Sequence, residues 1–249
     1  MSTDQDHSII AGSVSAHGCE INVRVEGEGE PLLLINGLTR SLGSWAPFAS
    51  AMSGRRIISF DAPGVGESPN SHLPLSIAQL ATLCVGVLDE LGLERVDVLG
   101  FSLGGAVAQE MAARHATRVR RLVLAATSCG IGSTLAGWDM RDSAAVLMNG
   151  LLRANALSTT WRVMALSSWS SIPYLGTLEA PTLVVCGSQD RVAPMANSRA
   201  LASRIPNATL IEISEGHDLQ ASGAAEQLAR VVDEFLAREA RSTKEQFAL

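Results

Sequence analysis

Hydrophobic positions recur along the chain with two different spacings. Short runs rich in leucine and β-branched residues predict strands, and longer stretches with apolar residues every three or four positions predict helices. One such helix covers residues 76–91, where Ile77, Leu80, Cys84 and Leu88 fall on one face and Gly92 is expected to end it. Residues 104–115 and 224–238 have the same helical spacing. Strands are expected at residues 13–14, 21–25, 32–35, 56–60, 96–99, 122–125, 182–186 and 209–213.

The order of these elements predicts an α/β fold. Strands that alternate with helices are typical of a mostly parallel sheet, here of eight strands, with helices on its faces. The first two strands are separated by a short turn at His17 and Gly18, so they are expected to form an antiparallel hairpin. A chain of 249 residues can bury one sizeable core, and we expect a single domain over residues 1–249.

Residues 130–179 interrupt the alternation. About fifty residues here separate two strands that a simple crossover would join with a dozen residues or slightly more. The segment contains three of the four tryptophans, Trp138, Trp161 and Trp169. We expect a small helical cap, inserted before the penultimate strand and covering the strand ends.

Composition excludes several classes of partner. The net charge is -6 and no basic run is present, so a nucleic-acid surface is not expected. No apolar run approaches the roughly 18–20 residues that span a bilayer, and the N-terminal region lacks the features of a signal peptide, so we expect a cytoplasmic protein without a membrane partner. The four cysteines are far apart in sequence and predict neither a metal site nor a redox pair. Among the 19 basic residues only Lys244 is lysine, which is typical of a GC-rich bacterial genome.

A candidate nucleophile lies between a predicted strand and a predicted helix. The sequence Gly-Phe-Ser-Leu-Gly at residues 100–104 matches the Gly-x-Ser-x-Gly turn known as the nucleophile elbow. In so tight a turn the residues two before and two after the serine pack against each other, and Gly100 and Gly104 meet that need. Ser102 would stand at the helix N-terminus, where free amides favour a developing negative charge.

A serine nucleophile needs a histidine base and a carboxylate that orients it. Of five histidines, only His217 follows a late strand, at the same carboxyl edge of the sheet as Ser102. Asp190 follows the penultimate strand and reaches this edge too. The rival carboxylate, Asp61, lies in a Pro-Gly-Val-Gly loop where we interpret it as a structural cap of local amides.

The oxyanion of a tetrahedral intermediate needs two amide donors. The first candidate is the N–H of Leu103, directly after the nucleophile. The second is the N–H of Leu38, because Gly37 allows a sharp turn after the strand at residues 32–35.

Together these residues make the chain resemble the α/β-hydrolase family over nearly its whole length. Ser102, Asp190 and His217 occur in the family's order, and residues 60–68 resemble its Asp-x-x-Gly-x-Gly-x-Ser loop. Residues 33–45 and 120–127 are most similar to intracellular polyhydroxyalkanoate depolymerases and related carboxylesterases, with a shortened cap. The family usually has His-Gly at the oxyanion loop, where this chain has Asn36-Gly37, a change that a backbone donor should tolerate.

The residues and the resemblance both favour hydrolysis of a carboxylic ester through an acyl-enzyme. We expect a small hydrophobic substrate contacted by Trp138, Trp161 and Trp169, and no cofactor or metal. The same triad also serves thioesterases, hydrolases of carbon–carbon bonds and perhydrolases, and these alternatives stay open. A non-hydrolytic cyclase or a ligand-binding protein is disfavoured by the complete triad. The sequence leaves a homodimer open.

Overall fold

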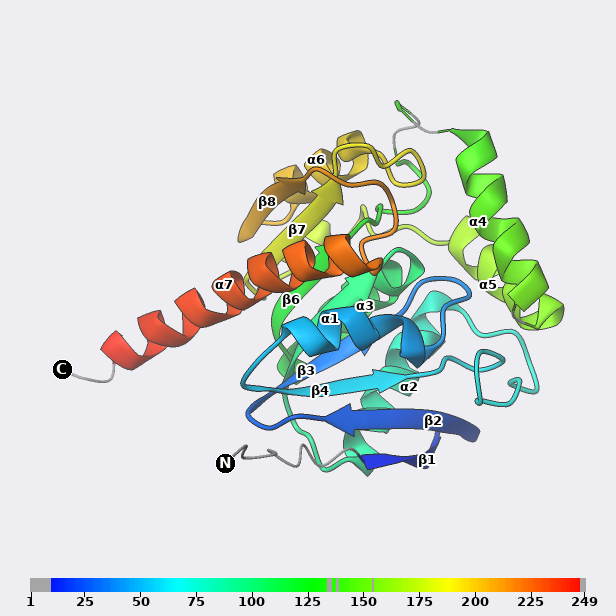
Figure 1. Ribbon diagram of the computed structural model, residues 1–249, viewed down its shortest axis with the longest axis horizontal. Helices are drawn as coiled ribbons and strands as arrows, with labels where there is room; N and C mark the ends of the chain where they lie inside the picture. Colours follow the sequence, from blue (N-terminus) through cyan, green and yellow to red (C-terminus); the bar gives the residue numbers. More distant parts are fainter. Residues whose placement is uncertain (1–9, 134–135, 138, 154, 247–249) are drawn as a thin grey trace, which may run out of the picture.

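The computed structural model describes residues 10–133, 136–137, 139–153 and 155–246, and its centre is an eight-stranded sheet (Figure 1). The strand order is β1-β2-β4-β3-β5-β6-β7-β8. β1 pairs antiparallel with β2, and β2 with β4, while all other pairs are parallel. Each of the eight strands predicted from the sequence is confirmed. Their bounds are β1 (Ile10–Ala16), β2 (Cys19–Glu26), β3 (Glu30–Ile35), β4 (Arg55–Phe60), β5 (Val96–Phe101), β6 (Val119–Ala125), β7 (Thr182–Gly187) and β8 (Ala208–Ile213).

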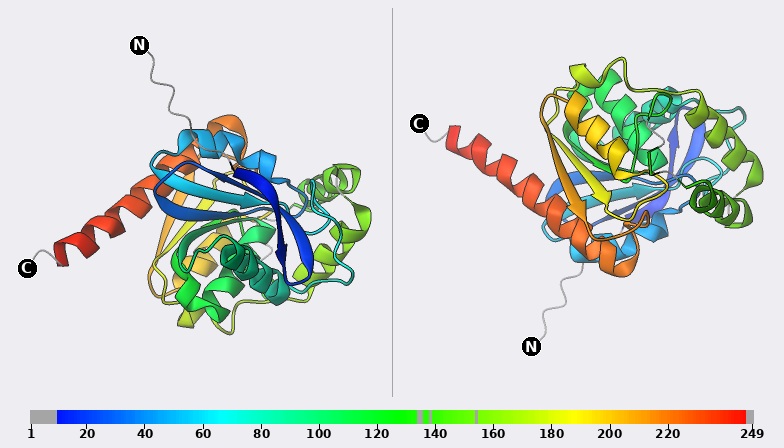
Figure 2. Two further views of the ribbon diagram at one scale, coloured as in Figure 1. Left: turned by 90° about the horizontal axis from the view of Figure 1, so that it is seen from below. Right: turned by 90° about the horizontal axis from the view of Figure 1, so that it is seen from above.

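Helices cover both faces of the sheet (Figure 2). Because side chains alternate along a strand, Val98 of β5 packs into one core and its neighbour Leu99 into the other. The first core includes the buried faces of α2 and α3, and the second those of α1 and α7. The bounds are α1 (Ala46–Ala51), α2 (Ile77–Glu90), α3 (Leu103–Arg114), α6 (Met195–Arg204) and α7 (Ser222–Gln246).

Local sequence signals explain where α2 begins and ends. Ser76 and Gln79 form a capping box, in which Gln79 N–H donates to Ser76 Oγ at 3.2 Å and Ser76 N–H donates to Gln79 Oε1 at 2.9 Å. Gly92 follows the helix with φ of 66° and ends it, as predicted. By contrast, α7 continues eight residues past the predicted end at residue 238.

Two helices between β6 and β7 form the cap that was expected before the penultimate strand. They are α4 (Met140–Arg153) and α5 (Ala156–Ser167), and they stand beside the sheet rather than in either covering layer (Figure 1). The Ser158 hydroxyl of α5 donates to the carbonyl of Gly64 at 3.0 Å, so α5 docks on the loop after β4. Within the described residues, no helix combines the length and apolar composition needed to cross a membrane.

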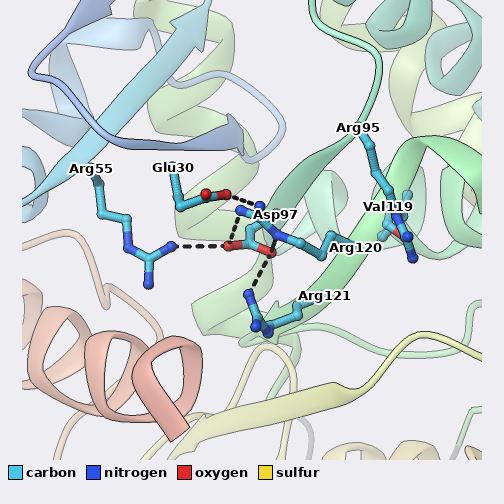
Figure 3. A network of polar contacts seen from close by, with 7 residues as sticks. All are labelled: Glu30, Arg55, Arg95, Asp97, Val119, Arg120 and Arg121. Atoms are coloured by element: carbon cyan, nitrogen blue, oxygen red, sulfur yellow. Dashed lines mark hydrogen bonds and ion pairs between the residues drawn. The ribbon is translucent and has the colours of Figure 1, made fainter. Parts of the chain in front are cut away.

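A buried charged network lies at the start of β5, away from Ser102 at its other end (Figure 3). Asp97 has no solvent exposure and accepts two hydrogen bonds from Arg120, both at 2.8 Å, and one from Arg55 at 3.1 Å. Arg121 approaches the same carboxylate at 3.5 Å, and Arg120 also pairs with the exposed Glu30. The Asp97 carboxylate thus links the N-terminal ends of the neighbouring strands β4, β5 and β6.

Replacing Asp97 by asparagine should destabilise the protein strongly, since it leaves buried guanidinium groups without their counter-ion. We expect the free energy of unfolding to fall by about 3–5 kcal/mol, measured by chemical denaturation. Glu30→Gln is the matched control, because this carboxylate is 63% exposed and its pair with Arg120 is worth about 0–1 kcal/mol. Equal losses in the two variants would contradict a stabilising role specific to Asp97.

Candidate active site

Ser102 occupies a strained turn between β5 and α3. Its φ of 54° and ψ of -118° lie outside the regions that residues with a side chain favour. Two contacts hold this conformation: Ser102 N–H donates to the carbonyl of Ala125 at 2.9 Å, and Thr127 Oγ1 donates to the Ser102 carbonyl at 2.7 Å. The strain is therefore maintained by the last residue of β6 and by Thr127 just after it.

The glycines on both sides of Ser102 are needed for close packing. A Cβ added at Gly100 would collide with the carbonyl oxygen of Gly104, and a Cβ added at Gly104 would collide with the carbonyl oxygen of Ile35. Both positions therefore exclude any larger residue. The geometry of a nucleophile elbow, expected from residues 100–104, is present.

His217 connects Ser102 to Asp190. Its Nε2 lies 3.1 Å from Ser102 Oγ, and its Nδ1 lies 2.9 Å from Asp190 Oδ2. The imidazole also packs against the Phe101 ring, with 5.4 Å between ring centroids. The three side chains that sequence order selected from distant positions thus meet in one hydrogen-bonded chain.

The carboxylate of Asp190 is fixed by the backbone. Asp190 is 4% exposed, and its Oδ1 accepts the N–H groups of Val192 and Ala193, both at 2.8 Å. These two bonds occupy one oxygen and orient the other toward His217. Oδ2 is thereby placed to accept a hydrogen bond from Nδ1–H of His217.

The rival carboxylate Asp61 belongs to a different network. Its Oδ1 accepts Leu42 N–H at 2.7 Å, and its Oδ2 accepts Asn22 Nδ2 at 2.8 Å and Glu67 N–H at 3.1 Å. Both oxygens are occupied by local loops, so Asp61 caps amides, which agrees with the interpretation from the sequence.

The two amides expected at the oxyanion position lie on either side of Ser102. Leu103 is the first residue of α3, so its N–H has no acceptor within the helix. Gly37 lies directly against the elbow, because a Cβ added there would be 3.4 Å from Ser102 Cβ. This contact puts the turn that carries Leu38 next to the serine.

Side-chain hydrogen bonds of Asn36, which the sequence did not reveal, stabilise this turn. Asn36 Nδ2 donates to the carbonyl of Ser41 at 2.7 Å, and Asn36 Oδ1 accepts Gln220 Nε2 at 2.7 Å. Gln220 follows His217 by three residues, so the bond joins the oxyanion loop to the histidine loop. The only local signal was asparagine at the position where the family usually has histidine.

The three tryptophans do not share one environment. Trp138 lies outside the described residues, and Trp161 is half-buried on α5. Trp169 is only 9% exposed, packs in the core beside α3 and donates its indole N–H to Glu110 at 2.9 Å. Its ring and its only polar atom therefore anchor the base of the cap, which favours a packing role for Trp169 over the substrate contact expected from the sequence.

A hollow of about 470 Å³ lies along the oxyanion loop and the cap, and Ser102, Asp190 and His217 are not among its lining residues. Its wall includes Arg40 and Ser41 of the oxyanion loop, Val146 of α4 and Asp218, the residue after His217. An ion pair between Arg40 and Asp218 spans its rim. The volume falls in the range typical of small-molecule pockets, about 300–1,000 Å³. Among the described residues, no group of three or more histidine, cysteine or acidic side chains is arranged to hold a metal ion.

A protein-family model matches most of the chain. The model described as alpha/beta hydrolase fold matches residues 30–144 and 150–224. These ranges include the elbow, Asp190 and His217, and they cover most of the chain.

The relatives and solved structures that resemble this chain are named for different substrates. Poly(3-hydroxyalkanoate) depolymerase of Ectopseudomonas oleovorans is 33% identical, covering 84% of this chain and 85% of the relative. 2-Hydroxymuconate semialdehyde hydrolase of Pseudomonas putida is 31% identical, covering 95% and 98%. The crystal structure of the enol-lactonase from Burkholderia xenovorans LB400 superimposes with a TM-score of 0.78 at 25% identity, covering 91% of this chain and all of the enol-lactonase chain.

Proposed function

Because this chain belongs to the alpha/beta hydrolase fold family, we propose that it is a serine hydrolase that cleaves a carboxylic ester through an acyl-enzyme. The observation that carries the proposal is the continuous hydrogen-bonded chain from Asp190 through His217 to Ser102 at a strained elbow. Such an arrangement has no evident structural use, since it maintains backbone strain and places a histidine at the sheet edge.

The first half-reaction forms the acyl-enzyme. His217 Nε2 takes the proton of Ser102 as Oγ attacks the acyl carbon, and Asp190 stabilises the imidazolium through Nδ1–H. The amides of Leu103 and Leu38 donate to the oxyanion of the tetrahedral intermediate. His217 then gives its proton to the departing alcohol oxygen.

The second half-reaction releases the acid. With the alcohol gone, His217 removes a proton from water, and the resulting hydroxide attacks the acyl carbon. The same two amides hold the second oxyanion, and the proton returns to Ser102 Oγ. Each step uses groups of this chain and water alone.

Of the two cap tryptophans that the structure describes, Trp161 is the one that we propose contacts the substrate. Trp161→Ala should alter the ratio of turnover of a long-chain ester to that of an acetyl ester by about tenfold to a few hundredfold, the value of one lost pocket contact. The measurement is kcat/KM for 4-nitrophenyl acetate and 4-nitrophenyl octanoate.

Trp169→Ala is the matched control, because its indole is buried and bonded to Glu110. It should lower stability by about 3–5 kcal/mol and reduce both turnovers together. An unchanged ratio in Trp161→Ala, or a changed ratio in Trp169→Ala alone, would contradict this assignment.

Hydrolysis of a carbon–carbon bond next to a carbonyl is the second candidate. It is favoured by the similarity to a hydrolase named for a semialdehyde, 2-hydroxymuconate semialdehyde, rather than for an ester. Thioester cleavage and perhydrolysis would use the same three side chains, but no such similarity favours either reaction.

Turnover of a substrate panel distinguishes these reactions. We expect activated and aliphatic esters to be hydrolysed with kcat/KM well above that for acyl thioesters and for vinylogous 1,5-diketones. Hydrolysis of the diketones in preference to every ester would overturn the ester proposal and favour the second candidate.

A further inference from the structure

Gln220, three residues after His217, buries an amide side chain between two loops. It is 2% exposed, and its Nε2 donates to Asn36 Oδ1 at 2.7 Å. Its Oε1 lies 3.3 Å from the hydroxyl of Ser44. A buried amide is unfavourable unless hydrogen bonds replace the water that it loses. Both of these contacts reach the oxyanion loop, residues 36–44, so the polar end of Gln220 is matched to that loop.

Asn36 closes the part of the oxyanion loop that carries Leu38. Residues 36–41 form neither a helix nor a strand, so no regular ladder of backbone hydrogen bonds fixes them. Instead, Asn36 Nδ2 donates to the carbonyl of Ser41 at 2.7 Å, and this bond encloses residues 37–40. The Asn36 side chain therefore stabilises the turn that presents the Leu38 amide.

The bond from Gln220 selects the orientation of the Asn36 amide. In the structure, Asn36 Oδ1 faces the NH₂ group of Gln220, and Asn36 Nδ2 faces the carbonyl of Ser41. Rotating the Asn36 amide by half a turn would bring its NH₂ group against that of Gln220 and its oxygen against the Ser41 carbonyl. Gln220 thus favours the one orientation in which Asn36 closes the oxyanion loop.

Gln220 is also bonded within the loop that carries the base. Its N–H donates to Asp218 Oδ1 at 3.2 Å, and Leu219 N–H donates to the carbonyl of His217 at 2.9 Å. Leu219 has no solvent exposure and packs in the second core. This compact turn fixes Gln220 relative to His217, so the side chain of Gln220 joins the histidine to the oxyanion loop.

A second link between the same two loops lies at the surface. Arg40 and Asp218 form an ion pair, with side chains that are 35% and 48% exposed. Exposed ion pairs contribute little, because water and salt screen them. The buried bond between Gln220 and Asn36 is therefore the stronger of the two links.

We propose that Gln220 is a positioning residue that acts through Asn36 to hold the Leu38 amide at the distance from Ser102 that the tetrahedral intermediate requires. This inference rests on the proposed ester hydrolysis. An oxyanion donor is effective only when it lies about 2.7–3.1 Å from the place that the oxyanion will occupy. The Leu38 amide and His217 belong to loops that are distant in sequence, so a contact between the loops sets their separation, and Gln220 supplies it.

Gln220→Met removes the bond and keeps a side chain of similar length. We expect kcat to fall by about tenfold to a hundredfold, somewhat less than the loss of a whole oxyanion donor. Both half-reactions pass through an oxyanion, so both rates should fall together and KM should change by less than about threefold. The measurement is steady-state hydrolysis of 4-nitrophenyl acetate, with active sites counted by titration to completion with a fluorophosphonate.

Inhibition by two ketones distinguishes a positioning role from a structural one. With 1,1,1-trifluorodecan-2-one, Ser102 Oγ bonds to the carbonyl carbon, the carbonyl electron pair moves to the oxygen, and His217 takes the serine proton. The affinity of Gln220→Met for this ketone should fall by about the same factor as kcat, because the adduct carries the oxyanion. The affinity for decan-2-one, which binds without forming the adduct, should be unchanged. Equal losses for the two ketones would overturn the positioning role.

Asn36→Ala removes the same bond from its other end and serves as the second variant. It should lower kcat at least as much as Gln220→Met does, because the bond to Ser41 is lost as well. Combining both substitutions should cost no more than Asn36→Ala alone, since Gln220 acts only through Asn36. Losses of kcat that multiply in the double variant would contradict this route.

Gln109→Met is the matched control for the loss of a buried amide. Gln109 has no solvent exposure, its Nε2 donates to the carbonyls of Gly105 at 3.0 Å and Ser128 at 3.1 Å, and its Oε1 accepts from Ser171 Oγ at 2.6 Å. This variant should lower the melting temperature at least as much as Gln220→Met, yet keep kcat per active site within about threefold of the wild type. An equal loss of kcat in the two variants would assign the effect to general destabilisation and overturn the proposal.

The outcomes for this inference and for the proposed function are distinguishable. If the wild type hydrolyses esters and Gln220→Met keeps both kcat and its affinity for the trifluoromethyl ketone, the positioning role is wrong and the ester hydrolase stands. If no ester is turned over, but the ketone binds through Ser102 and binds Gln220→Met at least tenfold more weakly, the positioning role stands and the ester proposal fails. A wild type that neither hydrolyses esters nor binds the ketone would overturn both.

Discussion

Replacing Ser102 by alanine is expected to lower kcat/KM for any hydrolysed ester by about 10⁴- to 10⁶-fold. The hydroxyl supplies the atom that bonds to the acyl carbon, and the remaining groups of the site contribute only binding and oxyanion stabilisation. The measurement is steady-state hydrolysis of the best ester from the panel, with purified variant and wild type at matched concentrations.

The Ser102→Ala protein should fold normally, so the loss of activity can be assigned to chemistry. The Ser102 N–H donates to the Ala125 carbonyl, and the Ser102 carbonyl accepts from Thr127 Oγ1, so neither bond involves the Ser102 hydroxyl. Alanine would face the same positive φ as serine. Unchanged circular dichroism and a melting temperature within a few degrees are the controls. Activity close to that of the wild type in this variant would exclude covalent catalysis by the serine.

Asp190→Asn is expected to lower kcat/KM by about 10⁴-fold while preserving the local geometry. The amide oxygen can still accept from Val192 and Ala193, but its NH₂ group then points at His217. His217 Nδ1 must become the acceptor of that bond, which leaves the proton on Nε2. In this tautomer the imidazole cannot take the proton of Ser102.

Asp61→Asn is the matched comparison for this carboxylate. It is equally buried and equally surrounded by donors, yet it bonds Asn22, Leu42 and Glu67 rather than His217. The substitution should lower the free energy of unfolding by about 1–3 kcal/mol and affect kcat/KM far less than Asp190→Asn does. If Asp61→Asn lost more activity per folded molecule, the carboxylate partner of His217 would have to be reassigned.

The sheet and the hydrogen-bonded triad follow from local patterns of the sequence. Each buried parallel strand is a compact apolar run, so its place could be predicted without knowing its partners. The elbow has its own local signature in Gly100, Ser102 and Gly104. Asp190 and His217 could be selected because a parallel sheet brings residues after different strands to one edge.

Features created by packing between distant segments could not be predicted in the same way. Nothing near Trp169 in sequence indicates that its indole bonds Glu110 of α3. Arg162 likewise lies in a helix whose buried face only the docking on Gly64 defines. The strand position of Asp97 gave no indication of its arginine partners, which come from β4 and β6.

Covalent labelling with a fluorophosphonate, followed by mass spectrometry of the intact and the digested protein, tests the proposed reaction most directly. The account predicts one adduct per chain on the peptide that contains Ser102, complete loss of hydrolysis at full labelling, and no adduct in Ser102→Ala. His217→Ala should form the adduct far more slowly, since it lacks the base that activates the hydroxyl. Full ester hydrolysis by a protein that forms no adduct, or an adduct on a residue other than Ser102, would contradict it.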